Sequence, residues 1–373
     1  MKKKVLTATL IIISSLIILL TYKKDNNVTF SDTSKNNNNL LSIMLETSSG
    51  SGDYQESLSN SFPRNGYIFN ENLSNCENGS KISWNEENKS VSVKSNKADK
   101  CHLYFDVYEP TLAETIINLY TGTQGENSIY YHDSNLTNGA NDNSYRYAGA
   151  NPNNYVCFGS DESTCPTDNL YRIIGVFEEN NHGVSGKKLV KIIKNDSYGT
   201  YEWHKKSGND WSIADLNKTL NSTFLTAQLS GYEDKIQSVA WKISGLGNES
   251  GVAKGIYTVE VANATKTYEA KVGLMYLSDY AYVSSPSYWE TSVFKYTAEV
   301  VATNWLYLDN KTQWVLTRAS TDNYDVFSIT NDGYVNGDNN AFSLYEVKPT
   351  FYLTSDILYA GGTGTLTDPY RTR

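Results

Sequence analysis

The stretch NYVCFGSDESTCPTDNLYRIIGVF, residues 154–177, puts Cys157 and Cys165 directly ahead of an apolar run that is typical of a buried β-strand. The chain contains two other cysteines, Cys76 and Cys101. The spacing fits neither a C-x-x-C redox pair nor a zinc site with matched histidines. Because disulfides persist in exported proteins, the sequence of an exported chain would favour the pairs Cys157–Cys165 and Cys76–Cys101 over a metal or catalytic role.

The N-terminus indicates that the chain is exported. Lys2, Lys3 and Lys4 precede an uncharged run, residues 5–22, which as a helix would reach roughly 27 Å and just span a bilayer. We expect residues 1–25 to be a signal anchor with a transmembrane helix over 5–22, and the positive-inside rule makes the C-terminal part extracellular. A cleaved signal peptide, and so a secreted protein, is the alternative, although the run does not end in small residues.

Three segments follow the anchor. Residues 26–61 are rich in Asn and Ser and poor in aromatic residues, which predicts a disordered stalk. Residues 62–108 contain four short strand-like runs between Asn, Gly and Lys turns, and the Cys76–Cys101 pair would staple them into a small β module. Residues 109–373 form the largest domain.

The domain 109–373 mixes strands with a few short helices. Thr111 and Glu114 form a capping-box pattern for a helix within 110–120, and apolar spacing predicts a second helix over 212–229 with Ser212 as its cap. Strand-like runs occupy 170–177, 188–194, 257–261, 266–278, 313–317, 324–329 and 347–353, and Asp332–Gly333 predicts a hairpin turn. The 29 tyrosines also favour β structure, so the predicted class is α+β with mostly antiparallel sheets.

Four motifs near the C-terminus carry a resemblance. They are W-x-L at 314–316, D-G-x-V at 332–335, V-K-P-x-F-Y-L at 347–353 and G-x-G-T-x-x-D-P-Y at 362–370. With them, residues 110–373 resemble an uncharacterised family of exported surface proteins of low-GC Gram-positive bacteria. That family is more distantly similar to the C-type-lectin-like fold of formylglycine-generating enzymes. The resemblance implies a C-type-lectin-like domain over 109–373.

The same resemblance argues against the chemistry of those enzymes and of calcium-dependent lectins. No cysteine follows Cys165, so the late copper-binding pair of the enzymes is missing, and the E-P-N or Q-P-D calcium motif is missing as well. Lys348 stands where the family pattern usually has Arg, which weakens any role that needs a bidentate guanidinium.

Composition and motifs narrow the function classes further. The net charge of −9 and the lack of a basic stripe make nucleic acid an unlikely partner. No metalloprotease, nucleophile-elbow or EF-hand motif occurs, so the sequence predicts no catalytic residue, no metal ligand and no cofactor. The acidic stretch 331–340, NDGYVNGDNN, offers carboxylates to a cation, but it also fits two hairpin turns, which we favour.

Aromatic residues supply the candidate binding surface. Tyr288, Trp289, Tyr324 and Tyr334 fall in loop-like stretches, and Arg318 follows a predicted strand. Exposed Tyr and Trp rings give rigid contact area with a polar handle, whereas the plainer interpretation is that the tyrosines fill β surfaces and Arg318 pairs with a core carboxylate. We expect a membrane-anchored extracellular binding or adhesion protein for an unknown protein or glycan. A surface glycan-acting hydrolase and a structural envelope component are the alternatives.

Overall fold

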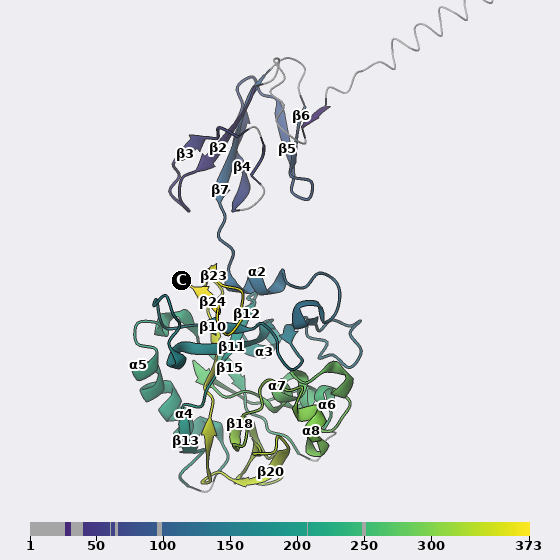
Figure 1. The fold of residues 1–373 in the computed structure, drawn as a ribbon, viewed down its shortest axis with the longest axis vertical. Coiled ribbons are helices and arrows are strands. Elements are labelled where there is room, and N and C mark those ends of the chain that lie inside the picture. Colours follow the sequence, from purple (N-terminus) through teal and green to yellow (C-terminus); the bar gives the residue numbers. More distant parts are fainter. Residues whose placement is uncertain are drawn as a thin grey trace, which may run out of the picture. The chain divides into compact units, whose positions relative to one another are not determined.

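The computed structural model describes residues 27–30, 40–59, 61–63, 66–94, 99–206, 208–247 and 251–373. The chain divides into two compact units, unit 1 up to Glu109 and unit 2 from Pro110 to Arg373 (Figure 1). Both are built mostly from β-sheet, and unit 2 adds short helices, so the α+β class is confirmed. The expected transmembrane segment, residues 5–22, lies outside the described residues.

Unit 1 contains two small sheets. One has the strand order β3-β2-β7-β4, in which β2 and β7 run parallel, and the other has the order β1-β6-β5. The strands are β1 (Asn27–Phe30), β2 (Leu40–Glu46), β3 (Tyr54–Glu56), β4 (Tyr67–Cys76), β5 (Lys81–Asn85), β6 (Ser90–Lys94) and β7 (Lys100–Val107). The strand-like runs expected between 66 and 108 therefore form strands.

Residues from both sheets share the core of unit 1. Alternate side chains of β2, β6 and β7 point inward because successive residues of a strand face opposite sides. The described buried members are Ile43, Phe62, Val91, Val93, Cys101, Leu103 and Phe105. Cys76 and Cys101 face each other across β4 and β7 and form the predicted disulfide.

The stalk prediction for residues 26–61 is wrong where the structure describes them. Residues 40–46 form β2, which pairs with both β7 and β3, and residues 54–56 form β3. The Asn- and Ser-rich composition hid the alternation of Leu41, Ile43 and Leu45, which pack on the core of unit 1. A partner strand more than fifty residues away supplies the hydrogen bonds that a local analysis cannot anticipate.

Unit 2 is organised around two sheets. The larger has the path β14-β22-β12-β11-β10-β24-β23, with β17, β9 and β8 attached beside it, and the smaller has the order β13-β21-β18-β19-β20. The larger sheet consists of β8 (Ile129–Tyr131), β9 (Tyr145–Tyr147), β10 (Tyr155–Cys157), β11 (Leu170–Phe177), β12 (Leu189–Lys194), β14 (Ile236–Gln237), β17 (Val272–Gly273), β22 (Thr350–Leu353), β23 (Tyr359–Gly361) and β24 (Tyr370–Thr372). The smaller consists of β13 (Gly199–Glu202), β18 (Gln313–Arg318), β19 (Asp325–Ile329), β20 (Val335–Asn340) and β21 (Leu344–Val347), and β15 (Val239–Lys242) pairs with β16 (Thr267–Ala270).

Short helices flank these sheets. Figure 1 shows α4 and α5 on one side of unit 2, and α6 and α8 on the other. The helices are α2 (Leu112–Ile117), α3 (Glu179–His182), α4 (Asp215–Thr219), α5 (Leu225–Gln228), α6 (Ala253–Tyr257), α7 (Leu277–Tyr282) and α8 (Ala298–Val301). π-Helical turns at Leu220–Phe224 and Thr258–Ala262 extend α4 and α6, and 3-10 turns occupy Glu126–Ser128, Thr167–Asn169, Trp211–Ile213, Glu233–Lys235, Pro286–Tyr288 and Val293–Lys295.

Several local predictions for unit 2 are confirmed. Thr111 caps α2 reciprocally with Glu114, β11 and β12 form an antiparallel pair, and the Cys157–Cys165 disulfide is present. Asp332–Gly333 forms the turn between β19 and β20, where Gly333 adopts a φ of +83°.

Other predictions for unit 2 are wrong. Residues 257–261, expected as a strand, are helical because Ile256 and Glu260, and likewise Tyr257 and Val261, lie four residues apart and bury one face of the helix. Ser212 does not cap α4; it sits in a 3-10 turn that Asp210 caps. The second expected turn, Asn-Gly-Asp at 336–338, lies inside β20 and forms a bulge.

Candidate functional site

The five predicted ligand residues occupy different environments. Trp289 is only 1% exposed, and its indole N–H donates to the carbonyl oxygens of Tyr282 and Ser284 at 3.1 and 3.2 Å. The expectation that Trp289 presents its ring at the surface is therefore wrong, since the ring belongs to the core of unit 2. Tyr288 is half-buried, and its hydroxyl donates to Glu299 Oε1 at 2.9 Å.

The other two tyrosines are exposed but have different neighbours. Tyr324 is 51% exposed and Tyr334 is 42% exposed. Tyr334 lines a shallow pocket with Tyr307 and residues of α8, whereas Tyr324 precedes β19. The structure therefore buries Trp289 and places Tyr288 and Tyr334 both beside α8.

Arg318 has a positioning role. Its Nε and Nη2 donate to the carbonyl oxygens of Ile243 and Ser244 at 3.2 and 3.0 Å, and its Nη1 donates to Asn209 Oδ1 at 3.3 Å. Its own carbonyl oxygen accepts the N–H of Leu246 at 2.9 Å. The guanidinium thus bonds main-chain groups and a neutral amide rather than the core carboxylate of the plainer interpretation, and it fixes the segment 243–246 beside β18.

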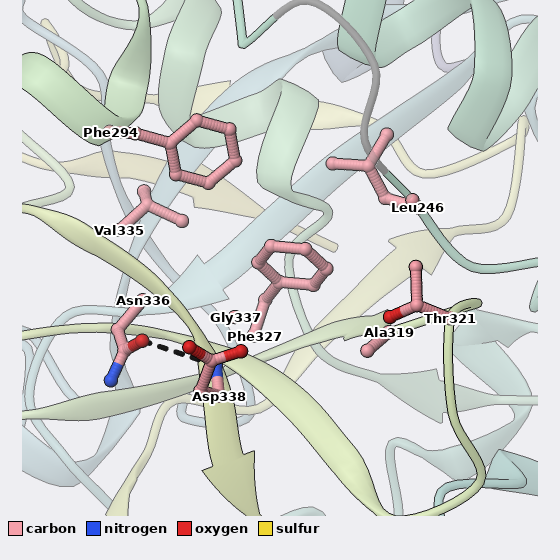
Figure 2. Close-up of a pocket in the computed structure, with 10 residues that line it drawn as sticks. Leu246, Phe294, Ala319, Thr321, Phe327, Val335, Asn336, Gly337 and Asp338 are labelled. Carbon is pink, nitrogen blue, oxygen red and sulfur yellow. Dashed lines mark hydrogen bonds between the residues drawn. The ribbon is translucent and has the colours of Figure 1, made fainter.

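That segment forms one wall of an open groove, which we call the β20 groove (Figure 2). The groove has a volume of about 380 Å³. Figure 2 shows the rings of Phe294 and Phe327 between Val335 on one side and Leu246 on the other, with Asn336 and Asp338 at the edge. The lining residues are Leu246, Gly247, Phe294, Ala319, Thr321, Phe327, Val335, Asn336, Gly337 and Asp338.

The bulge in β20 creates the polar edge of this groove. Val326 pairs with Asn339 and Ser328 pairs with Asn336, so β20 has one residue more than β19 between these pairs. Gly337 is required here because a Cβ at this position would lie 2.7 Å from the ring of Phe327. Asp338 is exposed, and its N–H donates to Asn336 Oδ1 at 3.1 Å.

The rim of the β20 groove is acidic. Asp338 is the carboxylate among its described lining residues, and Asp322 and Asp325 lie nearby outside the lining. Burial raises the pKa of Asp325, and the charges of Asp322 and Asp338 raise it further. The floor, by contrast, is apolar, and the ring of Phe294 is 40% exposed above Phe327 with 6.2 Å between centroids. An exposed ring beside carboxylate and amide groups can stack on a sugar ring and accept hydrogen bonds from its hydroxyls.

A second polar arrangement lies inside unit 2, and we call it the buried charge cluster: Asp142, Arg146, Lys191, Glu260 and Asp279. Arg146 Nη2 lies 2.6 Å from Asp142 Oδ2, and Arg146 Nη1 lies 4.0 Å from Asp279 Oδ1. Lys191 Nζ lies 2.5 Å from Asp279 Oδ2. Burial alone raises the pKa of Asp142, but the charges of Arg146 and His132 and the hydrogen bonds from Ser144 and Asn181 together outweigh burial and hold the pKa well below its usual range.

The aromatic residues around this cluster complete it. The guanidinium of Arg146 lies 4.7 to 5.1 Å from the ring centroids of Phe177, Tyr282 and Tyr257. The sequence predicted neither the cluster nor the β20 groove. The available signal was Lys191, a cation in the middle of the apolar run KLVKIIK.

Comparisons with known protein families, with characterised proteins and with solved structures find no match to this chain. Among the residues that the structure describes, no group of His, Cys, Asp and Glu side chains is arranged to hold a metal ion. Within the same residues, no helix has both the length and the hydropathy needed to cross a bilayer. Function is therefore argued from the geometry of the β20 groove.

Proposed function

We propose that the chain is an exported binding protein that holds a saccharide in the β20 groove of unit 2. The observation that carries the proposal is the pairing of an exposed ring, Phe294, with the polar edge made by Asn336 and Asp338. The C–H face of a sugar ring fits against an aromatic ring, and its hydroxyls donate to carboxylate and amide oxygens. The acidic rim favours neutral or cationic sugars over sulfated or carboxylated ones.

Binding is favoured over hydrolysis by the composition of the groove. Glycosidases usually place two carboxyl groups on either side of the bond that they cleave. Among the described lining residues of the groove, Asp338 supplies the single carboxylate.

Export and membrane attachment are part of the same proposal. Both cysteine pairs are disulfide-bonded, and such bonds persist outside the reducing cytosol, which supports export. The apolar run 5–22 would anchor the protein, with units 1 and 2 on the outer side of the membrane.

A C-type-lectin-like architecture for unit 2 is proposed on the four C-terminal motifs. One feature of the fold is compatible with it: the beginning and the end of unit 2 are joined, since the Tyr359 N–H donates to the Pro110 carbonyl oxygen at 2.9 Å and β10 pairs with β24.

The test uses the purified chain on a glycan array, followed by calorimetric titration of the saccharides that bind. Replacing Phe294 with Ala should weaken binding by about 1 kcal/mol, roughly a fivefold rise in Kd, because the stacking surface is lost. Phe342→Ala is the matched control, since Phe342 is 50% exposed and lies outside the groove. Equal loss in both variants, or no binding by the parent protein to any neutral or amino sugar, contradicts the proposal.

A further inference from the structure

Lys191 and Asp279 meet in the interior of unit 2. Lys191 lies on β12, between β11 and β22 in the larger sheet, and Asp279 lies on α7. The amine and carboxylate atoms are 2.5 Å apart, and the two side chains are 0% and 2% exposed. Because 88 residues separate the pair along the chain, any bond between them would tie a central strand to a distant helix.

The lysine amine is poorly provided with acceptors. A charged ammonium has three N–H donors, and among the described residues one oxygen, Asp279 Oδ2, accepts from it. Aromatic rings occupy much of the remaining space, with the centroids of Tyr276, Tyr352 and Trp241 at 4.2, 5.4 and 5.5 Å. An amide N–H would need one acceptor, so the single oxygen satisfies the hydrogen-bonding capacity of an amide but not that of an ammonium.

Glu260 lies near this pair, although its carboxylate forms no salt bridge with Lys191. Its Oε1 and Oε2 accept the N–H groups of Leu277 and Ser278 at 3.0 and 2.9 Å, and Asp279 Oδ2 accepts the N–H of Tyr276 at 2.8 Å. Three consecutive backbone amides therefore hold the two carboxyl groups next to each other. Burial raises the pKa of Glu260 and lowers the pKa of Lys191, which favours a neutral acid and a neutral amine.

We propose that Lys191 Nζ and Asp279 Cγ condense within the folded chain to form an intramolecular amide bond, with Glu260 as the proton donor and acceptor. A proton first passes from the lysine ammonium to the aspartate carboxylate along their hydrogen bond. The free amine then attacks Cγ. Glu260, once its carboxyl group has approached the amine, takes a proton from Nζ and gives one to the departing hydroxyl, and the Cγ–O bond breaks. One amide and one water molecule result, and no oxidant or second substrate is consumed.

The rest of the cluster fits this reaction. Arg146 Nη1, 4.0 Å from Asp279 Oδ1, would stabilise the negative oxygen of the tetrahedral intermediate. After the reaction, the charges of Lys191 and Asp279 disappear together, and Arg146 keeps Asp142 as its partner at 2.6 Å. The buried charge cluster is thus left with the Arg146–Asp142 ion pair and with Glu260, whose pKa burial raises.

Intact mass spectrometry of the full chain under non-reducing conditions tests the bond. The expected mass is that of the chain with two disulfides, less one water molecule. Trypsin should fail to cleave after Lys191, and a branched peptide should join residue 191 to residue 279. A mass without the loss of water, together with tryptic cleavage after Lys191, overturns the proposal and leaves a buried ion pair.

Two variants identify the groups involved. Asp279→Ala removes the carboxyl group and should restore the full mass. Glu260→Gln keeps the size of the side chain but cannot transfer the proton, so it should also restore the full mass; continued loss of water in this variant would overturn the role of Glu260. The measurement on the parent chain needs no variant, so the proposal remains testable if either variant fails to fold.

Discussion

Units 1 and 2 both hold a buried carboxylate with backbone amides, and unit 2 also holds buried carboxylates with cations. In unit 1, Glu46 is buried, and its two oxygens accept the N–H groups of Gly52 and Val107 at 3.0 and 2.9 Å. In unit 2, Glu260 is held by the Leu277 and Ser278 amides in the same way, whereas Asp142 and Asp279 face the cations Arg146 and Lys191. The addition follows from size, because a larger unit buries a larger fraction of its surface and can enclose whole ion pairs.

The two units also differ in how much apolar surface they bury. The described core of unit 1 consists of a few residues around one disulfide, whereas that of unit 2 extends through both of its sheets. Small units with little core depend on covalent staples. The comparison teaches that unit 1 should depend on its disulfide much more than unit 2 depends on its own.

The largest expected effect is the loss of the Cys76–Cys101 bond. It closes a loop with a sequence separation of 25, so replacing both cysteines with Ala should cost about 3.5 kcal/mol and unfold unit 1. Limited proteolysis followed by mass spectrometry should show cleavage within residues 40–109 and an intact unit 2. The matched change is Cys157→Ala with Cys165→Ala, which has a separation of 8 and should cost about 2.5 kcal/mol without unfolding unit 2. Equal protease resistance of the two units in both double variants would contradict the comparison.

Lowering the pH should destabilise unit 2 before unit 1, which is the reverse of the order expected for loss of the disulfides. Burial lowers the pKa of His182 to about 4, and its Nδ1 accepts the Val184 N–H at 3.1 Å, which requires the neutral ring. The unfolded histidine titrates near pH 6.5, so between about pH 6.5 and 4 the unfolded chain binds the extra proton, and unit 2 loses on the order of 2–3 kcal/mol as the pH falls.

Unit 1 should respond only at lower pH. Burial alone raises the pKa of Asp99, but hydrogen bonds from Ser80 and from the Asn78 and Lys100 amides outweigh it and lower the pKa to about 2. Because the unfolded carboxyl titrates near pH 3.9, this contribution is lost only as the pH falls from about 4 to 2. Amide hydrogen exchange at pH 7, 5 and 4 shows which unit loses protection first. In the His182→Gln variant, the protection of unit 2 should fall less as the pH is lowered. Loss of amide protection in unit 1 at a higher pH than in unit 2 would contradict this prediction.

Lys348 offers a gain in stability that is confined to unit 2. It is 5% exposed, and burial lowers its pKa to about 7, with the nearby charge of Arg172 as a second cause. Between about pH 7 and 10 the unfolded chain binds more protons at this residue, so the stability of the parent protein should rise with pH. Lys348→Met should add about 2 kcal/mol at pH 7 and remove that rise. Urea unfolding at pH 7 and 9 measures both quantities, and a destabilised variant would contradict the burial argument.

The smallest expected effect concerns the first helix of unit 2. Thr111 Oγ1 accepts the Glu114 N–H at 3.1 Å, and Glu114 Oε2 accepts the Thr111 N–H at 2.8 Å. Thr111→Ala should cost about 1 kcal/mol. The control is Thr123→Ala in an exposed loop, which should stay within about 0.5 kcal/mol of the parent in the same thermal unfolding experiment. Equal thermal stability of the Thr111→Ala and Thr123→Ala variants would show that the cap does not stabilise unit 2.

Local patterns in the sequence predicted the features that depend on neighbouring residues. The capping box at Thr111, the β11–β12 pair, the turn at Asp332 and the Cys157–Cys165 disulfide are of this kind, whereas Cys76–Cys101 followed as the remaining pair of four cysteines. The helix over 253–262 could not be predicted, because its β-branched residues favour a strand and only the packing of one face on unit 2 makes it helical.

The candidate site was harder to predict because it depends on the bulge in β20. A sequence reader sees Asn-Gly-Asp as a turn, and nothing local shows that Phe294, Leu246 and Asp338 meet. The exposure of the aromatic side chains could not be predicted either. Trp289 and Tyr324 both lie in loop-like sequence, but they are 1% and 51% exposed.

The most direct test of the saccharide site is a residue-resolved NMR titration of the purified chain with the neutral or amino sugar that binds best on the array. The account predicts saturable shifts at Leu246, Phe294, Phe327 and Asp338, with unit 1 unchanged. Shifts that gather around Tyr288 or Tyr334, or in unit 1, while the groove stays unperturbed, would contradict it.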